Sequence, residues 1–252
     1  MSHGDLVRRA QAAAAVMPYQ SFSTSQLLAI EKAIRLVWDE SIAIQKLWEK
    51  DFDSCKEVEI STILIETFAI LQTDTSEGRE SPLAGFFSHF QIVTPDASLR
   101  DYQRKALQKR PDFSFRSTEI PKAGINPYFW ALFAEAKVIS QKRTIADYVN
   151  NGLAKFVRGE YGWAMSQGMM LCYLQDTDQS LPKALNEHLN RHGKRELHLV
   201  EKFAEPVPWS RTHMRVHQTV HGRKWRYLET EKEPGSIAIF HLWLEVPAPK
   251  RT

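Results

Sequence analysis

Two charged residues interrupt an apolar run near the middle of the sequence. Residues 133–139 read Phe-Ala-Glu-Ala-Lys-Val-Ile, and Glu135 and Lys137 are the only charged members of the run. In a β-strand, side chains two positions apart project from the same face. Because burial of an unpaired charge is costly, an apolar strand that carries a carboxylate and an amine on one face indicates a functional site.

A second carboxylate, Asp112, stands at the head of another short apolar segment, residues 113–115. Hard cations such as Mg²⁺ prefer oxygen ligands and retain several waters, so two carboxylates suffice to hold one. A nearby lysine can orient or polarise the attacking water, or offset charge that develops on a phosphate. Asp112, Glu135 and Lys137 together therefore predict a Mg²⁺ or Mn²⁺ site with hydrolytic chemistry, and its metal would be oxygen-bound.

The motifs Pro111-Asp112 and Glu135-Ala136-Lys137 resemble those of the PD-(D/E)xK nuclease superfamily, which includes many restriction endonucleases and DNA-repair nucleases. The resemblance covers residues 57–175. It implies a metal-dependent nuclease that hydrolyses phosphodiester bonds, with DNA as the substrate. The alternative is structural: an aspartate in a turn and an ordinary Lys–Glu pair at a strand edge.

The resemblance also implies a role for each site residue. Asp112 and Glu135 would hold the metal together with the backbone carbonyl of Ala136, and Lys137 would position or activate water. Glu66, on an apolar helical segment, would supply a further carboxylate to the metal. The alternative for Glu66 is a partly exposed position at the edge of an amphipathic helix.

Basic residues beyond the motif indicate contacts to nucleic acid. The resemblance implies that Lys155 and Arg158 bind the scissile phosphate from the helix that follows Lys137; an ordinary solvated helix face is the alternative. A C-terminal run alternates basic and aromatic residues with small ones, and with the segment after Gly222 it predicts a basic hairpin that binds a phosphate backbone. The basic residues of this predicted hairpin are Arg211, Arg215, Arg223, Lys224 and Arg226. An exposed strand pair without a ligand is the alternative.

Composition sets limits on the class of protein. The chain has 252 residues, of which 43% are hydrophobic, and it contains no apolar run of transmembrane length. The net charge of +3 is uneven, because residues 1–98 contain 8 basic and 14 acidic residues and residues 99–252 contain 25 and 16. The positive part includes the candidate site, as binding to a polyanion requires. The only two cysteines, Cys55 and Cys172, stand in apolar contexts and indicate reduced thiols in a cytoplasmic protein.

Hydrophobic periodicity indicates an α/β or α+β fold. The resemblance adds a restriction-endonuclease-like core with a mixed central sheet flanked by helices. We expect an N-terminal helical segment at residues 1–56, the nuclease-like core at 57–180 and a β-rich C-terminal extension at 181–252. The expected helices are 24–50, 57–72, 144–173 (one helix, or two with a break near Gly159 or Gly162) and 184–191; the expected strands are 113–115, 132–139, 196–202, 211–218, 224–228 and 237–246; residues 83–93 are ambiguous.

The resemblance therefore implies a Mg²⁺- or Mn²⁺-dependent (endo)deoxyribonuclease, acting as a restriction or anti-phage defence effector. A homodimer would allow two sites to cut both strands, and a partner protein is the other means of targeting. No membrane association is expected. The alternatives are a non-catalytic nucleic-acid-binding or scaffold subunit on a nuclease-like fold, and an RNA-directed nuclease.

Overall fold

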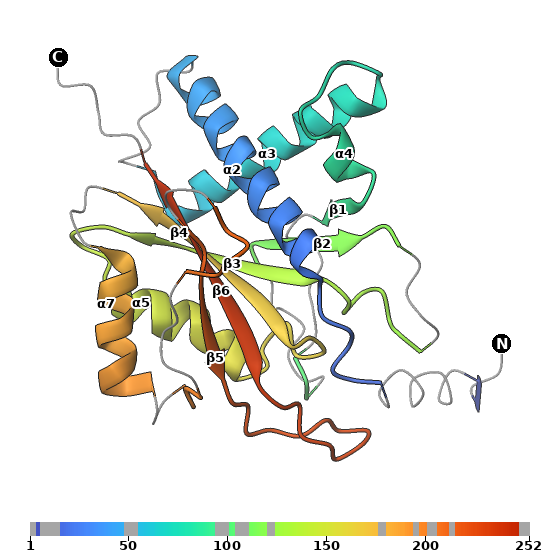
Figure 1. Ribbon diagram of the computed structural model, residues 1–252, viewed down its shortest axis with the longest axis vertical. Helices are drawn as coiled ribbons and strands as arrows, with labels where there is room; N and C mark the ends of the chain where they lie inside the picture. The colour runs from blue at the N-terminus through green and yellow to red at the C-terminus, as the bar shows by residue number, and fades with distance from the viewer. Residues whose placement is uncertain are drawn as a thin grey trace.

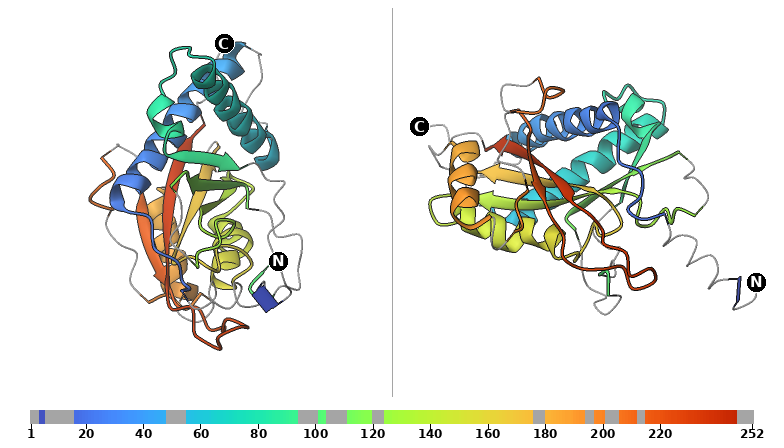
Figure 2. Two further views of the ribbon diagram at one scale, coloured as in Figure 1. Left: turned by 90° about the vertical axis from the view of Figure 1, so that its right-hand side faces the viewer. Right: turned by 60° about the horizontal axis from the view of Figure 1, so that its bottom comes forward.

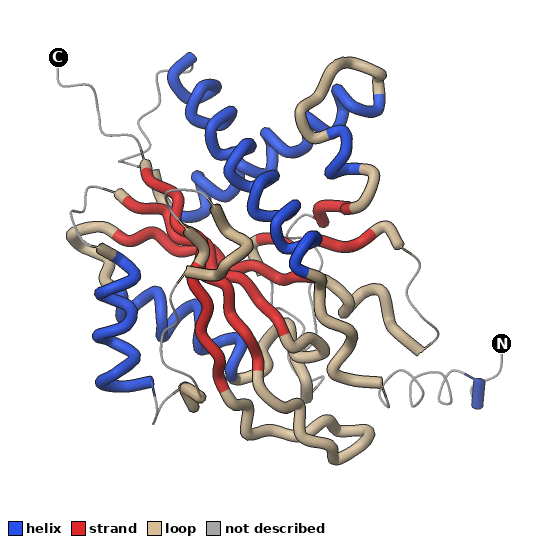
Figure 3. Tube along the Cα trace, viewed as in Figure 1, coloured by secondary structure: helices blue, strands red, loops and turns tan. Residues whose placement is uncertain are grey.

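The structure is a computed structural model that describes residues 4–5, 16–47, 55–93, 101–103, 111–119, 124–175, 180–193, 197–200, 206–211 and 215–246. Within these residues, six strands form one mixed sheet in the order β1-β2-β3-β4-β6-β5 (Figures 1 and 3). The strands are β1 Phe90–Val93, β2 Phe113–Ser117, β3 Leu132–Ile139, β4 Gln167–Leu174, β5 His217–His221 and β6 Ile237–Glu245. The helices are α2 Thr24–Leu47, α3 Glu57–Ser76, α4 Ala84–Phe87, α5 Ile145–Tyr148, η2 Val149–Leu153, α6 Ala154–Val157, α7 Leu181–His188 and η3 Leu189–Gly193.

The sheet combines an antiparallel meander with a parallel centre. Strands β1, β2 and β3 pair antiparallel in sequence order, whereas β3, β4 and β6 are parallel and β5 closes the far edge antiparallel to β6. A parallel pair requires a crossover connection, and the continuous segment α5–η2–α6 provides it between β3 and β4. This crossover brings helical residues close to β3, where the two motif residues Glu135 and Lys137 lie.

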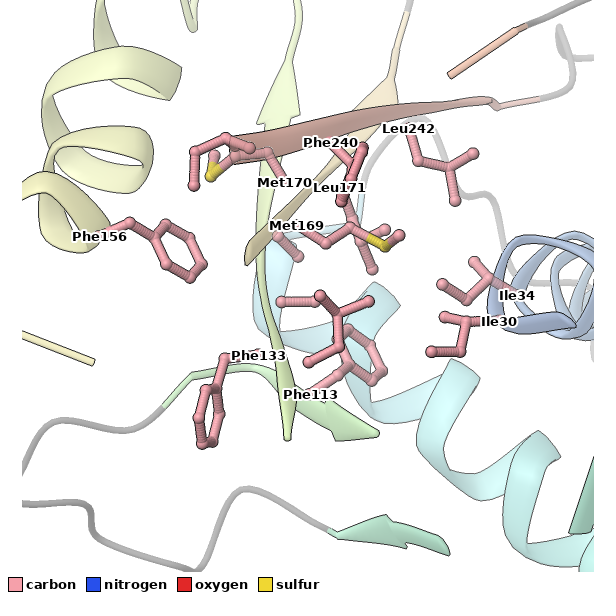
Figure 4. Close-up of a cluster of buried hydrophobic side chains, with 14 of the residues drawn as sticks. Ile30, Ile34, Phe113, Phe133, Phe156, Met169, Met170, Leu171, Phe240 and Leu242 are labelled. Carbon is pink, nitrogen blue, oxygen red and sulfur yellow. The ribbon is translucent and has the colours of Figure 1, made fainter. Parts of the chain in front are cut away.

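Helices cover both faces of the sheet. In the right-hand view of Figure 2, α2 and α3 lie on one side of the strands and α5 and α7 on the other. Figure 4 shows Ile30 and Ile34 of α2 on one side of the central strands and Phe156 of α6 on the opposite side. One hydrophobic cluster runs from Met17 to Val246, so the described parts of the three predicted segments share a core. No helix in the described part of the chain combines the length and apolarity needed to cross a bilayer.

Most predicted elements are confirmed with small shifts in their bounds. The helices at 24–50 and 57–72 correspond to α2 and α3, and the strand at 132–139 matches β3. The ambiguous segment 83–93 contains both a short helix, α4, and a strand, β1. The predicted strand 237–246 is β6, and its pairing with β4 and β5 makes the C-terminal region an extension of the central sheet.

The predicted helix over residues 144–173 is wrong in its second half. The helical segment ends at Val157, and Gly159 and Gly162 follow with φ values of 71° and 65°, a backbone conformation that glycine adopts without strain. The rest of the run is β4, whose residues from Gly168 to Tyr173 are all buried. A strand buried on both faces is continuously apolar, so its sequence does not differ in period from a buried helix.

The predicted C-terminal basic hairpin is also wrong. Residues 224–228 form no strand, and β5 starts only at His217 and pairs with β6 instead. Residues 212–214, within the predicted strand 211–218, lie outside the described residues, as do residue 196 and residues 201–202 of the predicted strand 196–202. Without a partner strand at 224–228, the alternating pattern does not define one basic face.

Arg223 is a structural residue and not a nucleic-acid contact. Its side chain is buried, with only 5% of the residue exposed, and it stacks on the Trp225 ring at 5.2 Å. The guanidinium group donates hydrogen bonds to four backbone carbonyls, those of Trp163, Met165, Pro234 and Gly235, at 2.8–3.2 Å. A guanidinium provides five donors in a fixed geometry, so Arg223 ties the β5–β6 connection to the segment that leads into β4.

We expect Arg223→Met to destabilise the fold. Loss of the guanidinium leaves buried carbonyls without a donor, at about 1–3 kcal/mol each, so we expect the free energy of unfolding to fall by about 3 kcal/mol or more in urea. Lys224→Met is the matched control, because Lys224 is exposed and surface substitutions usually change stability by less than about 0.5 kcal/mol. Equal stability of the two variants would contradict the structural role of Arg223.

Candidate active site

The two motif carboxylates meet where β2 begins. Phe113 of β2 pairs with Ala134 of β3, and extension of this antiparallel register by one residue places Asp112 directly opposite Glu135. The Asp112 carboxylate accepts a hydrogen bond from the backbone N–H of Ala136 through Oδ2 at 2.7 Å. The Ala136 N–H lies beyond the last pair of β2 and β3, and the Asp112 side chain accepts its hydrogen bond in place of a β2 carbonyl. This hydrogen bond fixes the position of Asp112 relative to Glu135.

Glu135 is a buried carboxylate surrounded by donors. Only 2% of its side chain is exposed, and its Oε1 lies 2.8 Å from Nζ of Lys137 and 2.5 Å from Nζ of Lys155. Its Oε2 accepts a hydrogen bond from the hydroxyl of Tyr161. Burial, followed by the nearby Glu135 charge, raises the pKa of Tyr161 well above its ordinary value, so this phenol remains a donor at neutral pH. Charge-assisted hydrogen bonds of this kind are strong enough to keep a carboxylate in the interior.

Lys137 joins the motif to helix α3. Its Nζ donates to the Ala136 carbonyl at 2.7 Å and to Oε1 of Glu57, the first residue of α3, at 2.6 Å. Burial acts to lower the pKa of Lys137, but the Glu135 and Glu57 carboxylates outweigh it and raise the pKa above its ordinary value. Lys137 is therefore a cation at neutral pH, suited to donate hydrogen bonds to a water or to a phosphate oxygen but not to accept a proton.

Asp112 is held in an environment unfavourable to its charge. Burial and repulsion from Glu135 raise its pKa to about 7, against the opposing effects of the Ala136 N–H and the Lys137 ammonium. Two carboxylates opposite one another on adjacent strands repel, and a nearby cation relieves this repulsion. The Asp112–Glu135 pair thus has the electrostatic character of a cation site.

The donor atoms at this point suit a hard divalent cation. Asp112 and Glu135 offer carboxylate oxygens. The carbonyl of Ala136, the residue after Glu135 in β3, offers a further oxygen. Among the described residues, no three His, Cys, Asp or Glu side chains gather as a metal-binding group. A metal held here would depend on two carboxylates, a backbone carbonyl and water, which is the ligand set typical of Mg²⁺ rather than of zinc.

Glu66 does not reach this cluster. It is exposed on α3 and lies nine positions from Glu57, a distance of about 13.5 Å along the axis at 1.5 Å per residue. The carboxylate that α3 brings to the cluster is Glu57, which binds Lys137.

Among the predicted phosphate contacts, Lys155 alone lies at the site. Arg158 turns away to pair with Glu160 at 2.8 Å, and 57% of its side chain is exposed. The other predicted basic residues do not line the cleft beside the motif: Arg211, Arg215, Lys224 and Arg226 are exposed elsewhere, and Arg223 is buried. Lys155 was predicted to bind a phosphate, and in the structure it binds Glu135.

A cleft of about 580 Å³ lies beside the cluster. Its lining combines four basic, two acidic and three uncharged residues: Lys56, Lys137, Arg143, Lys155, Glu57, Asp147, Val58, Val138 and Asn151. Lys137 and Lys155 both line the cleft and contact Glu135, so the two ammonium groups stand between the cleft and this carboxylate. A substrate in the cleft would meet these lysines first.

A π-helical turn brings Lys155 to its position. The segment η2 interrupts the helix between α5 and α6, and such turns occur often at functional sites. At Gly152, an added Cβ would lie 2.5 Å from Cε of Met170 and 3.3 Å from Cγ of Lys137. Glycine at this position therefore permits the helix to approach β3 and β4 closely, which places Lys155 over Glu135.

The sequence did not identify Glu57, Tyr161, Lys56 or Arg143 as members of the site. The one available signal was for Glu57, an acidic residue in the first turn of a predicted helix, and that position is common on grounds of the helix dipole alone. Comparisons of the chain with protein-family models, with curated proteins and with solved structures found no match.

Because the pKa of Asp112 is raised, we expect the difference in unfolding free energy between wild type and Asp112→Asn to depend on pH when a chelator is present. Between its ordinary value of 3.8 and about 7, the folded protein holds a proton on Asp112 that the unfolded chain has released. Wild-type stability therefore falls as pH rises through this range. One pKa unit corresponds to about 1.36 kcal/mol. Between pH 5 and pH 8, we therefore expect the unfolding free energy of Asp112→Asn to rise by about 2–3 kcal/mol relative to that of the wild type.

Urea unfolding at the two pH values measures this difference. Asp39→Asn, which removes an exposed carboxylate, controls for the loss of one negative charge. A difference between Asp112→Asn and wild type that stays constant with pH would contradict the unfavourable burial of the Asp112 charge.

Proposed function

We propose that the protein is a metal-dependent nuclease with a PD-(D/E)xK-like core, which hydrolyses phosphodiester bonds in DNA. The observation that carries the proposal is the position of Asp112 opposite Glu135, with the Ala136 carbonyl and Lys137 beside them. Three oxygens and one ammonium thus converge at the end of a short strand pair. This is the set of groups that metal-assisted hydrolysis of a phosphodiester requires.

Each residue of the cluster has a distinct task in this proposal. Asp112, Glu135 and the Ala136 carbonyl would hold Mg²⁺ or Mn²⁺, which would supply Lewis-acid activation of the phosphate and of water. Lys137, a fixed cation, would donate to the attacking water or to a phosphate oxygen as charge develops there. Glu57 orients Lys137. Lys155, which lines the cleft beside Glu135, would contact the scissile phosphate.

The order of elements supports a restriction-endonuclease-like core. Helix α3 is followed by the meander β1–β2–β3, the crossover helices α5–η2–α6 and the parallel strand β4. This is the order of helix, strands, helix and strand that the sequence resemblance implies for a nuclease core. The basic balance of residues 99–252 also supports a polyanionic substrate. A role as a restriction or anti-phage effector, as a homodimer or with a targeting partner, completes the proposal.

One observation favours a different function. Every oxygen of the Glu135 carboxylate already has a donor, and Asp112 already accepts from a strand-edge N–H. A fold that needs these groups only for its own stability would be a non-catalytic nucleic-acid-binding or scaffold protein. RNA is the alternative substrate, because the cluster recognises a phosphodiester and contains no group specific to deoxyribose.

A cleavage assay tests the proposal. Purified protein is incubated with supercoiled plasmid, linear duplex, single-stranded DNA and structured RNA, each with Mg²⁺, Mn²⁺ or EDTA. We expect metal-dependent cleavage that falls by at least about 100-fold in Asp112→Ala and Lys137→Ala, the scale of loss for a group that stabilises transition-state charge. Glu66→Gln is the matched control and is expected to retain wild-type activity, because Glu66 lies away from the site. Cleavage that survives both alanine variants would contradict the proposed roles.

Tyr161 provides a second test, through a residue that holds a ligand in place. We expect Tyr161→Phe to lower both Mn²⁺ affinity and cleavage by about 10–100-fold, the range for loss of a hydrogen bond to a metal ligand. The phenylalanine keeps the packing against Phe156 and removes only the donor to Glu135. Tyr128→Phe, at an exposed tyrosine, is the control. Wild-type Mn²⁺ affinity in Tyr161→Phe would show that Glu135 needs no such orientation.

A further inference from the structure

The cleft beside the candidate site has the volume of a small-ligand site. Its volume of about 580 Å³ falls within the range of about 300–1,000 Å³ that holds small ligands. A space of this volume can accommodate one nucleotide unit of a bound strand.

Two basic residues that line the cleft, Lys56 and Arg143, form no ion pair with the described carboxylates. Of the two acidic residues in the lining, Glu57 binds Lys137, and Asp147 accepts hydrogen bonds from the backbone N–H and hydroxyl of Thr144. Within the described residues, no carboxylate lies at ion-pair distance from Lys56 or Arg143. These two cations are therefore available to an anion in the cleft.

Both cations are attached to anchored backbone. Arg143 ends a tight turn after β3, in which its carbonyl accepts from the Ser140 N–H at 3.0 Å and its own N–H donates to the Ser140 hydroxyl at 3.3 Å. Lys56 precedes α3, and its N–H donates to Glu59 at 2.6 Å. The two residues thus flank β3 and α3, the elements that supply Lys137 and Glu57 to the same cleft. The start of the 20-residue helix α3 adds the positive end of its dipole.

We infer that Lys56 and Arg143 form a second phosphate-binding subsite, which holds the phosphate next to the scissile one on the same nucleic-acid strand. This inference rests on the proposed nuclease function and extends it, since it names the residues that hold the substrate backbone beside the point of cleavage. Arg143 can bind a phosphate through two parallel hydrogen bonds and Lys56 as a point charge.

The remaining lining residues indicate weak base preference. Val58 and Val138 provide apolar surface for a sugar or a base, and Asn151 is the one neutral polar side chain among the described residues that line the cleft. Aromatic side chains, on which single-strand binders stack bases, do not occur among these described residues. Contacts with these residues therefore favour the backbone of the strand over its sequence.

Salt-dependent binding of a labelled single-stranded oligonucleotide, measured in EDTA, tests the subsite. Each phosphate contact to a single strand contributes about 0.7 to the slope of log affinity against log salt concentration. We expect the double variant Lys56→Ala/Arg143→Ala to bind more weakly, with a slope smaller by about 1.4. Lys142→Ala/Lys183→Ala is the matched control; it removes two exposed lysines, one of them adjacent to Arg143, that do not line the cleft.

Cleavage of single-stranded and duplex DNA by the same proteins separates the two proposals. Cleavage by wild type that is reduced in the double variant and not in the control supports the subsite. A slope that matches the control overturns the subsite, and the nuclease proposal survives if wild type still cleaves. If wild type cleaves nothing, the nuclease proposal fails, and the salt slope still decides whether Lys56 and Arg143 bind phosphate.

Discussion

Burial of the Glu135 carboxylate is the constraint on which the rest of the site depends. A buried carboxylate without partners would cost several kcal/mol, so the fold must bring donors to it from several parts of the chain. Lys137 comes from the same strand, Lys155 from the crossover helix and Tyr161 from the loop before β4. One side chain thereby couples the position of β3 to that of the helices on its face.

Glu135 lies next to the point where pairing of β2 with β3 ends, so unpaired backbone groups of β3 are available beside it. Because pairing of β2 with β3 stops at Phe113 and Ala134, the next N–H and carbonyl groups of β3 are available to side chains. Asp112 takes the N–H of Ala136, and Lys137 takes its carbonyl. Asp112 is thus held by a backbone N–H, and Glu135 by two ammonium groups and a phenol. A divalent cation would satisfy the oxygens of both carboxylates. The structural role of these residues is compatible with the proposed catalytic one, since the carboxylates need positive charge nearby in both.

The sequence predicts the site residues whose role follows from the spacing of charged and apolar residues along one segment. Charges two residues apart in an apolar run identified Glu135 and Lys137 on one face of β3, and the same run fixed the bounds of the strand. Glu57 could not be distinguished from Glu66, because which turn of α3 faces Lys137 depends on how the helix packs and not on its own sequence. Arg223 looked like a surface cation, since sequence does not reveal the four carbonyls that surround it. The continuous apolar run of β4 favours a helix as much as a strand, because burial on both faces removes the periodicity that distinguishes the two.

Mn²⁺ binding to the isolated protein tests the central claim most directly, because it requires no knowledge of the substrate. Titration calorimetry on wild type, Glu135→Gln and Glu66→Gln compares the proposed ligand with a carboxylate away from the site. The account predicts one Mn²⁺ per chain, with affinity reduced by more than about 10-fold in Glu135→Gln and unchanged in Glu66→Gln. Equal Mn²⁺ affinity in wild type and Glu135→Gln would contradict it and leave Glu135 as a structural charge.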